Sequence, residues 1–496
     1  MNKNLLSTSV AGLLVLAALT GCTTTQEEYH YVNLSQVACT FQGTGNQPLT
    51  VSVITAPATW SAVPEASWVT AEKGEDGESL IINVADNTTE SERETRITVS
   101  AGEAEQQIRI SQLAQDNGFS RYRRINTFSK KTGVMSPNGK YIGGFITTIA
   151  PDDSYLHAPA ILDTDTEEIY EFGPYPEALY SLYQPTAITD QGLLFISDGY
   201  HGGQIAIDLD GDIFKPEAPA GYKGAPAVSA SSSDGKYWVG YALEASIHEG
   251  LTKPLLWIDG VPHELPLPDK NFRDEEFIIG AMARGISANG EIIYGTSWDN
   301  ADTGMMYWVN RGTDTEKPRW VGEDVRVVTP VILETPDGVK HDYHIANGLI
   351  CAAERTKISP SGRWIASSYR TEEIAEDKHT IRTTQTAAFY NTETETTTIV
   401  DDYGESTGRY VTDDGIAFIG LGSANITSSR VYDLNTHTDL GSMEDWIYEN
   451  YGIIIPGGSI TYVSPDGKYM LGTIMEMGAI GGPQFVSWYI APPTAK

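Results

Sequence analysis

Aromatic, histidine and arginine side chains recur in the polar stretches that separate the apolar runs of this chain. Aromatic faces stack on the C–H groups of sugars, and arginine and histidine donate hydrogen bonds to polar ligands. Together they would form a platform for a sugar chain or a peptide. Arg284 and Arg409 each stand three residues before a Ser or Thr that begins the same type of turn. The candidate ligand-binding residues are Tyr155, His157, Tyr200, His201, Arg284, Trp298, Arg409 and Trp446. The competing interpretation of each is ordinary packing beside a loop.

The sequence has no complete motif for metal binding, cofactor binding or nucleophilic catalysis. The segment Asp208–Asp212 begins like a calcium loop, but Ile213 and Pro219 stand where that loop needs Gly and Glu. It therefore predicts a turn. His341 and His344 are expected in a solvated loop, because their spacing is weak geometry for a metal site. No zinc-protease, Cys-x-x-Cys, Gly-x-Ser-x-Gly or phosphate-loop motif occurs in the sequence. We expect neither a metal nor a cofactor.

Seven turns of the form Ser/Thr-x-x-Gly, with Asp, Asn, Ser or Gln before the Gly, recur along the chain at the start of similar units. Proline or another residue at the second position, a short polar residue and then Gly suit a tight hairpin turn, so the apolar runs on both sides should be antiparallel neighbours. Successive copies lie 43 to 72 residues apart. Units of that length built only from strands are typical of β-propeller blades. The seven copies are Ser136–Gly139, Thr189–Gly192, Ser232–Gly235, Ser287–Gly290, Ser359–Gly362, Thr412–Gly415 and Ser464–Gly467.

The two ends of the repeat region predict how the ring closes. The last unit has three strands before the chain reaches Lys496, whereas Arg121–Phe128 is strand-like and has no unit of its own. Pairing these segments would remove two open edges. We therefore expect a seven-bladed β-propeller over residues 119–496. The longest interval leaves residues 319–352 as either an insertion or a degenerate eighth unit. With the turns on one face, the ligand is expected among the variable loops of the other.

The first residues read as a targeting segment. Lys3 is followed by the apolar run Val10–Leu19, which is too short to span a bilayer, and then by Leu19–Cys22. This segment resembles a bacterial lipoprotein signal, which implies a signal peptide over residues 1–21 and lipidation of Cys22. The acidic residues of the tether 22–32 resemble a surface-export signal. The resemblance implies a lipid-anchored protein of the outer membrane that faces the cell exterior.

Residues 33–115 have no long repeat and show short alternating strands, which predicts a β-sandwich. Thr59–Ser61, Ser67–Thr70, Arg93 and Ile110–Gln112 follow one another in an order that resembles the BACON domain. That resemblance implies an immunoglobulin-like fold and a place in glycan utilisation. Trp60 and Trp68 invite a sugar-stacking role, but their alternating neighbours favour the core of the sandwich. The expected fold class is thus all-β, with this sandwich followed by the propeller.

Charge and cysteine content limit the partners. The chain has 66 acidic and 33 basic residues and a net charge of −33, which opposes binding to nucleic acid and to anionic membrane surfaces. Neutral glycans, cationic ligands and peptides remain possible. Of the three cysteines, Cys39 and Cys351 are expected to be free and buried.

Three functions compete at this level. The first is a non-catalytic surface lipoprotein that captures extracellular glycan for an outer-membrane importer of the SusC/SusD-like type. The second is an accessory or structural subunit of such an importer, including one that handles peptides. The third is a propeller-fold enzyme that acts on glycans, since carboxylate pairs occur by chance among so many acidic residues.

Overall fold

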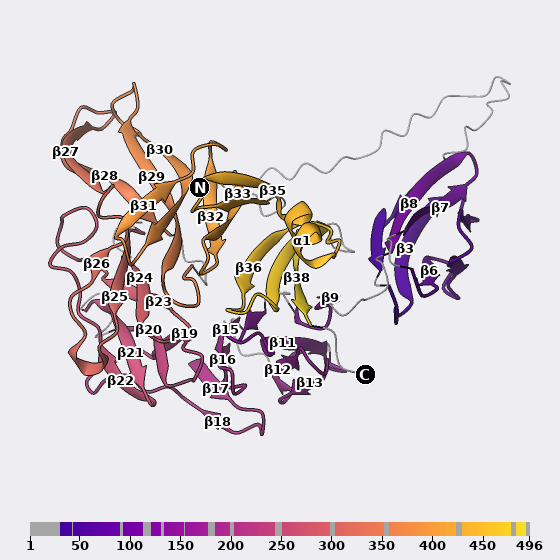
Figure 1. The fold of residues 1–496 in the computed structure, drawn as a ribbon, viewed down its shortest axis with the longest axis horizontal. Coiled ribbons are helices and arrows are strands. Elements are labelled where there is room, and N and C mark those ends of the chain that lie inside the picture. The colour runs from indigo at the N-terminus through magenta and orange to yellow at the C-terminus, as the bar shows by residue number, and fades with distance from the viewer. Residues whose placement is uncertain are drawn as a thin grey trace, which may run out of the picture.

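The computed structural model is built almost entirely from strands (Figure 1). It describes residues 30–41, 43–89, 93–112, 121–129, 133–152, 154–176, 184–198, 203–243, 250–297, 303–351, 357–422, 429–477 and 483–492. The all-β fold class predicted from the sequence is confirmed. The signal segment and Cys22 lie outside the described residues.

The N-terminal strands form a sandwich of two four-stranded sheets. One sheet has the order β1 (Tyr31–Leu34), β3 (Leu49–Ala56), β6 (Ser79–Val84) and β5 (Val69–Lys73). The other has the order β2 (Ala38–Phe41), β8 (Ala104–Gln112), β7 (Arg93–Ala101) and β4 (Ser61–Pro64). Alternate residues of these strands, such as Val51, Leu80 and Ile97, are fully buried between the sheets.

Both tryptophans of the sandwich belong to its core, as the alternation of their neighbours predicts. Trp60 is buried, and its Nε1 donates to Gly77 O at 3.0 Å. Trp68 is half-buried against the same cluster, with the Arg93 guanidinium 4.3 Å from its ring centroid. Their ring faces are therefore occupied by the protein itself.

The described strands after residue 120 form seven further sheets, which we number 1 to 7 along the chain. Sheet 1 contains β10 (Val134–Met135), β11 (Tyr141–Ile149), β12 (Tyr155–Asp163), β13 (Ile169–Glu171) and β14 (Tyr175–Pro176). Sheet 2 contains β15 (Gln184–Ile188), β16 (Leu194–Asp198), β17 (Gly203–Ile207) and β18 (Ile213–Phe214). Sheet 3 contains β19 (Ala227–Ser231), β20 (Tyr237–Leu243), β21 (Thr252–Ile258) and β22 (Val261–Glu264).

Sheet 4 contains β23 (Ala281–Ile286), β24 (Ile292–Ser297), β25 (Met305–Val309) and β26 (Arg319–Trp320). Sheet 5 contains β27 (Val327–Glu334), β28 (Lys340–Ile350), β29 (Trp364–Ile374), β30 (Ile381–Asn391) and β31 (Thr396–Ile399). A short 3-10 helix, Gly312–Asp314, lies between β25 and β26. Sheet 6 contains β32 (Ser406–Val411), β33 (Ile416–Leu421), β34 (Ser429–Asp433) and β35 (Thr438–Ser442). Sheet 7 contains β36 (Ser459–Val463), β37 (Met470–Met477), β38 (Pro483–Ala491) and β9 (Arg121–Arg124). The helix α1 (Met443–Tyr451) connects sheets 6 and 7.

The long interval around residues 319–352 is an insertion into sheet 5. Its strands β27 and β28 form a hairpin, and Gly348–Ile350 of β28 pair with Ser368–Arg370 of β29. The innermost segment of sheet 5 is residues 357–359, since Ile358 bridges Ile365 of β29. His341 and His344 therefore lie on a strand, and the prediction of a solvated loop is wrong for them.

Each repeat turn links the innermost segment of a sheet to its second strand. In the last copy, Ser464 Oγ accepts from Tyr469 N at 3.0 Å and donates to Asp466 Oδ1 at 2.7 Å. The turn ends on Gly467 with φ of 70°, a left-handed conformation that a side chain would strain. The glycines of all seven copies have φ between 70° and 85°. The prediction of turn chemistry for these serines and threonines is confirmed.

Hydrogen bonds also join neighbouring turns. Asn138 N donates to Asp190 Oδ1 at 2.8 Å, and Ser361 N donates to Asp413 Oδ1 at 2.8 Å. Further links run from Asp190 N to Ser233 O, from Ser233 N to Ala288 O, from Ala288 N to Pro360 O, from Tyr410 Oη to Val463 O and from Tyr462 Oη to Pro137 O. The turns thus form a connected circle on one face.

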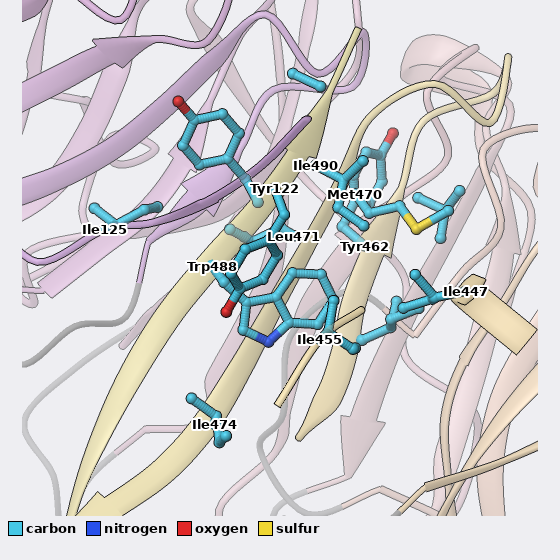
Figure 2. Close-up of a cluster of buried hydrophobic side chains, with 14 of the residues drawn as sticks. Tyr122, Ile125, Ile447, Ile455, Tyr462, Met470, Leu471, Ile474, Trp488 and Ile490 are labelled. Atoms are coloured by element: carbon cyan, nitrogen blue, oxygen red, sulfur yellow. The ribbon is translucent and has the colours of Figure 1, made fainter. Parts of the chain in front are cut away.

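The ring closes as the two chain ends predict. Arg121–Arg124 of β9 pair antiparallel with Trp488–Ala491 of β38, which gives sheet 7 its fourth strand. Figure 2 shows Trp488 at the centre of the cluster there, and its ring lies 5.8 Å from that of Tyr122. The same cluster includes residues of sheets 1, 6 and 7. Other apolar clusters join sheets 1 with 2, 2 with 3, 3 with 4, 4 with 5 and 5 with 6. The sheets therefore pack face to face around a common axis.

Candidate functional site

A cavity of about 340 Å³ lies on this axis, bounded by the innermost segments of all seven sheets. Its lining runs from the first residues of β15 and β36, Gln184 and Ser459, to turn residues such as Pro137 and Pro360. Its polar lining comes mainly from Gln184, Thr186, Ser229, Ser231, Arg284, Arg409, Ser459 and Thr461. Its apolar lining includes Val134, Met135, Ile188, Ile286, Ile358, Ile460 and Leu471.

Five inner strands carry a β-bulge at the same position of the repeat. The pairing register skips one residue in β15, β19, β23, β32 and β36, and each skipped residue stands three positions before the Ser or Thr of its turn. A bulge leaves one residue without a partner across the strands and redirects its side chain. We call these five residues the bulge ring. Its members are Thr186, Ser229, Arg284, Arg409 and Thr461, and all five line the cavity.

The corresponding positions in the other two sheets complete this pattern. In sheet 1 the residue is Gly133, which also lines the cavity. In sheet 5 it is Thr356, which lies outside the described residues. The members of the bulge ring are half-buried, whereas the residue before each of them is buried. Their side chains are therefore the part of each inner strand that a ligand in the cavity would meet.

Arg284 is held at the cavity by its own sheet and by the neighbouring one. Its Nε donates to Thr296 Oγ1 at 3.4 Å, and its guanidinium lies 5.8 Å from the ring centroid of Tyr241 in sheet 3. Thr296 is fully buried. These contacts fix the direction of the side chain while it remains half-buried.

Arg409 is positioned by a glycine and by a lysine. A Cβ on Gly420 would lie 2.5 Å from Arg409 Nε, so the side chain runs over a place where a larger residue would displace it. Lys357, buried at 3% exposure, donates from Nζ to Gly408 O at 2.7 Å and to Arg409 O at 3.3 Å. A positive group of sheet 5 therefore lies against the bulge of sheet 6.

The cavity wall differs in charge from the chain as a whole. The chain carries a net charge of −33, but the described lining contains two arginines and no Asp, Glu or His. The one aromatic residue of that lining, Tyr462, uses its Oη to donate to Pro137 O at 2.7 Å. Burial raises the pKa of Tyr462 well above its ordinary value, so the hydroxyl stays protonated. The wall offers hydroxyl, amide and guanidinium groups.

The predicted site residues separate into three groups. Arg284 and Arg409 lie together on the cavity wall. Tyr155, His157 and Trp446 lie elsewhere, and Tyr155 is 50% exposed at the start of β12, opposite Ile149. Tyr200, His201 and Trp298 fall outside the described residues. A ligand-binding role for any of these residues stays a prediction.

His157 and Trp446 occupy places that differ from the loops expected for them. His157 is buried within sheet 1, where Nδ1 lies 2.9 Å from Thr147 Oγ1. Trp446 lies on α1 and packs edge-to-face on Phe418 at 5.4 Å, within the cluster that joins sheets 6, 7 and 1. It does not line the cavity. Both side chains serve the packing of the ring.

The helix α1 itself was missed because its surroundings read as strands and loops. Ser442 caps it by accepting from Asp445 N at 3.1 Å, and Gly452 ends it in the left-handed conformation. This Ser-x-x-Asp pattern followed by a glycine is the usual signal for both ends of a helix. It was present in the sequence.

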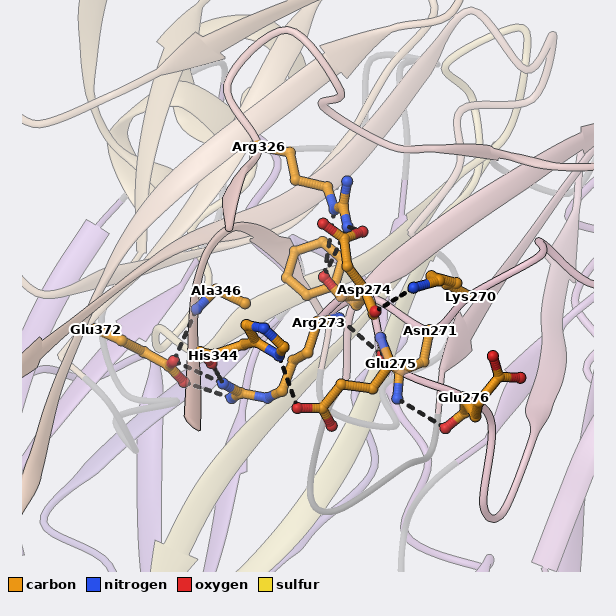
Figure 3. Close-up of polar contacts among 11 residues, drawn as sticks. Lys270, Asn271, Arg273, Asp274, Glu275, Glu276, Arg326, His344, Ala346 and Glu372 are labelled. Carbon is orange, nitrogen blue, oxygen red and sulfur yellow. Dashed lines mark hydrogen bonds and ion pairs between the residues drawn. The ribbon is translucent and has the colours of Figure 1, made fainter. Parts of the chain in front are cut away.

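A second polar cluster lies away from the cavity, between the segment 265–280 and the extended part of sheet 5. Figure 3 shows Arg273 reaching Glu372, with distances of 2.9 Å from Nη1 to Oε2 and 2.7 Å from Nη2 to Oε1. Ala346 N donates to the same carboxylate at 3.1 Å, and Arg370 Nε lies 3.3 Å from it. Burial alone would raise the pKa of Glu372, but these hydrogen bonds and charges outweigh it and lower the pKa.

This cluster fastens the insertion to the ring. The side chains of Arg273 and Glu372 are 9% and 3% exposed. At its edge, His344 Nδ1 lies 2.9 Å from Glu275 Oε1. No sequence pattern links these residues, because they are far apart in the chain.

The described part of the chain shows neither a cluster of metal-binding side chains nor a helix suited to a membrane. That part holds no group of three or more His, Cys, Asp or Glu side chains arranged to bind a metal ion. Asp208 Oδ1 accepts from Asp210 N at 3.0 Å and from Asp212 N at 2.9 Å, which is the predicted turn. Cys39 and Cys351 are buried and form no disulfide with each other, as predicted. None of the helices found there has the length and apolar character needed to cross a membrane.

Comparison with known proteins gives one family match and several distant structural neighbours. Residues 58–113 match the BACON family, described as "Putative binding domain, N-terminal". A search of curated proteins gives no match. The structure is similar to hydrazine synthase of Kuenenia stuttgartiensis, with 14% identity, a TM-score of 0.37 and coverage of 73% of this chain and 98% of the other.

Two further neighbours are of the same kind. The β-propeller domain of the Trilobed protease of Pyrococcus furiosus has 10% identity and a TM-score of 0.40, covering 75% of this chain and 93% of the other. A quinoprotein alcohol dehydrogenase-like protein of Bacteroides thetaiotaomicron has 10% identity and a TM-score of 0.26, covering 92% of this chain and 95% of the other. The chain thus carries a BACON domain, which is immunoglobulin-like, followed by a β-propeller.

Proposed function

We propose that this protein binds saccharide in the axial cavity of its propeller and does not itself cleave it. The observation that carries the proposal is the bulge ring, which turns one polar side chain from each of five inner strands toward a common cavity. Hydroxyl and guanidinium groups at fixed positions are the groups that bind the hydroxyls and ring oxygens of sugars.

The described wall has no carboxylate or imidazole for acid–base catalysis, which favours binding over hydrolysis at this cavity. The BACON domain at residues 58–113 also supports a carbohydrate-related binding role.

We further propose that the protein works at the outer surface of the outer membrane. The support is the lipoprotein-like segment that ends at Cys22, together with the acidic residues that follow it. A lipid at Cys22 would hold the protein near a SusC/SusD-like transporter, which would accept the captured glycan. We also propose that the seven described sheets are all the blades of the ring, since sheet 7 closes on β9 and packs with sheet 1.

Affinity gels that contain neutral and acidic polysaccharides test the proposal with the full-length chain. We expect retardation by at least one polysaccharide. Ser229→Phe, which places a ring in the cavity from a bulge position, should abolish it. The matched variant Thr383→Phe places the same ring on an exposed position of β30 and should leave it intact.

Three outcomes would overturn the proposal. The first is that no polysaccharide retards the protein, which would favour the accessory subunit. The second is that a retained polysaccharide is cleaved and releases product, which would favour the enzyme. Equal retardation of both Phe variants would place the binding surface outside the axial cavity.

A further inference from the structure

We infer that the saccharide bound in the axial cavity carries an anionic group, either a carboxylate or a sulfate. This inference deepens the proposed function and rests on it. It starts from the uneven distribution of charge around the bulge ring. Arg284 belongs to sheet 4 and Arg409 to sheet 6, the two sheets that flank sheet 5 in the ring. The remaining members, Thr186, Ser229 and Thr461, carry hydroxyls.

The two arginines share one position of the repeat, three residues before the turn, and therefore the same level along the axis. Both side chains are half-buried and line one cavity of about 340 Å³, so we place the anionic group of the ligand against both. A guanidinium binds carboxylate or sulfate oxygens through two parallel N–H groups, which makes such pairs stronger than neutral hydrogen bonds. On the opposite side, Thr186 Oγ1 donates to Phe195 O at 3.2 Å and Thr461 Oγ1 donates to Leu471 O at 3.1 Å. These two hydroxyls can therefore accept hydrogen bonds from the sugar hydroxyls of the same ligand, and Ser229 supplies a third hydroxyl.

The surroundings increase the positive character of this side. Lys357 lies behind the bulge of sheet 6 and donates to Gly408 O and Arg409 O. The described cavity wall has no acidic side chain, although the chain has twice as many acidic as basic residues. A positively lined cavity concentrates anions, because its walls focus the field of the arginines and reduce its screening by bulk water.

The arginines are also held in place before any ligand arrives. Thr296 Oγ1 and the ring of Tyr241 orient Arg284, and Gly420 leaves the space that Arg409 occupies. A preorganised group loses less conformational entropy on binding, so the side chains contribute more to affinity and selectivity. Such support is what a specific anion contact needs.

The test uses the full-length chain and a panel of polysaccharides with matched chemistry. Neutral glucans, mannans and galactans form one arm, polygalacturonate and alginate the second, and chondroitin sulfate and sulfated galactan the third. For each acidic polysaccharide that is retained, the carboxyl-reduced or desulfated derivative is compared. The second and third arms distinguish a carboxylate from a sulfate. We expect one acidic polysaccharide to be retained and its neutralised derivative to bind at least tenfold more weakly.

Substitutions of the two arginines then test whether they contact the anionic group. Arg284→Gln and Arg409→Gln should each lower the affinity for the acidic polysaccharide about tenfold, since each removes charge-assisted hydrogen bonds. Arg409→Lys keeps the charge and should have an intermediate effect, which also separates recognition from folding. Arg382→Gln, on an exposed arginine of β30, is the control and should bind like the wild type. Thermal melting of each variant checks that the ring remains folded.

The outcomes separate this inference from the proposed function. Retention of neutral polysaccharides only, or equal affinity for an acidic polysaccharide and its neutralised derivative, would overturn the inference and leave saccharide binding in place. Retention of no polysaccharide would overturn both. Binding of the acidic polysaccharide that survives both Gln substitutions would also overturn the inference, because the anionic group would then lie away from the bulge ring.

Discussion

Replacing Glu372 by Gln should destabilise the propeller far more than the same change at its neighbour Glu373. The Glu372 carboxylate is 3% exposed and accepts two hydrogen bonds from Arg273 and one from Ala346 N. A Gln side chain has a single acceptor oxygen and presents an N–H₂ group to the guanidinium. It also leaves Arg273 as a buried charge without its counter-ion. Breaking a buried ion pair in this way costs about 3–5 kcal/mol of unfolding free energy.

Glu373→Gln is the matched control, because it lies on the same strand and pairs with Arg382 at the surface. The two side chains of that pair are 61% and 66% exposed and lie 3.4 Å apart. Solvent screens such a pair, so its loss should cost about 0–1 kcal/mol. Urea denaturation followed by tryptophan fluorescence measures both changes, and the m-value shows whether the transitions stay comparable. If Glu372→Gln lies within about 1 kcal/mol of Glu373→Gln, the buried pair does not fasten the insertion.

The pH dependence of this difference gives a second check. The pKa of Glu372 lies below its ordinary value, so the folded state favours the ionised carboxylate. The stability that Glu372 contributes is therefore fully present above the ordinary pKa of Glu, about 4.3, and is lost as pH falls through the lower native pKa. The gap between wild type and Glu372→Gln should be constant at neutral pH and should narrow only in acid. A gap that widens in acid would contradict the sign of the shift.

Three further changes probe the ring and the thiols. Trp488→Ala removes a fully buried side chain where sheets 7 and 1 meet, and it should cost about 3–5 kcal/mol in urea denaturation. Tyr462→Phe removes the hydrogen bond to Pro137 O and should cost about 1–2 kcal/mol, with no effect at all arguing against that contact. Burial raises the pKa of Cys39 to about 12, so iodoacetamide at pH 8 should modify Cys39 and Cys351 only after unfolding, as peptide mass spectrometry would report.

The propeller architecture could be predicted from the sequence because the same turn conformation recurs at every sheet. Each turn needs Gly in a left-handed conformation, so the seven copies could be recognised without homologues. The same register predicted that Arg284 and Arg409 would occupy equivalent places. It did not predict the bulges that turn these side chains inward, since Thr186, Ser229 and Thr461 show no chemical likeness to arginine.

Most features that the sequence did not predict depend on contacts between distant parts of the chain. β12 is covered on both faces, so His157 lies in a continuous buried run with no alternation to mark it. Arg273 and Glu372 lie 99 residues apart in the chain and meet only because the insertion extends sheet 5, so no local pattern predicts their pairing. The helix carrying Trp446 had local signals in Ser442 and Gly452, but strand patterns on both sides dominated the interpretation.

Pairing of β9 with β38 has a consequence for how the protein is made. β9 is the first described strand of the propeller to be synthesised, whereas β38 is the last. During translation the first sheet therefore has neighbours on one side only, and Trp488 has not yet arrived to cover Tyr122. Contacts between such distant segments form late and slowly, because the intervening chain must be ordered first. The propeller should consequently reach its full resistance to proteolysis only after the last strand has been released from the ribosome.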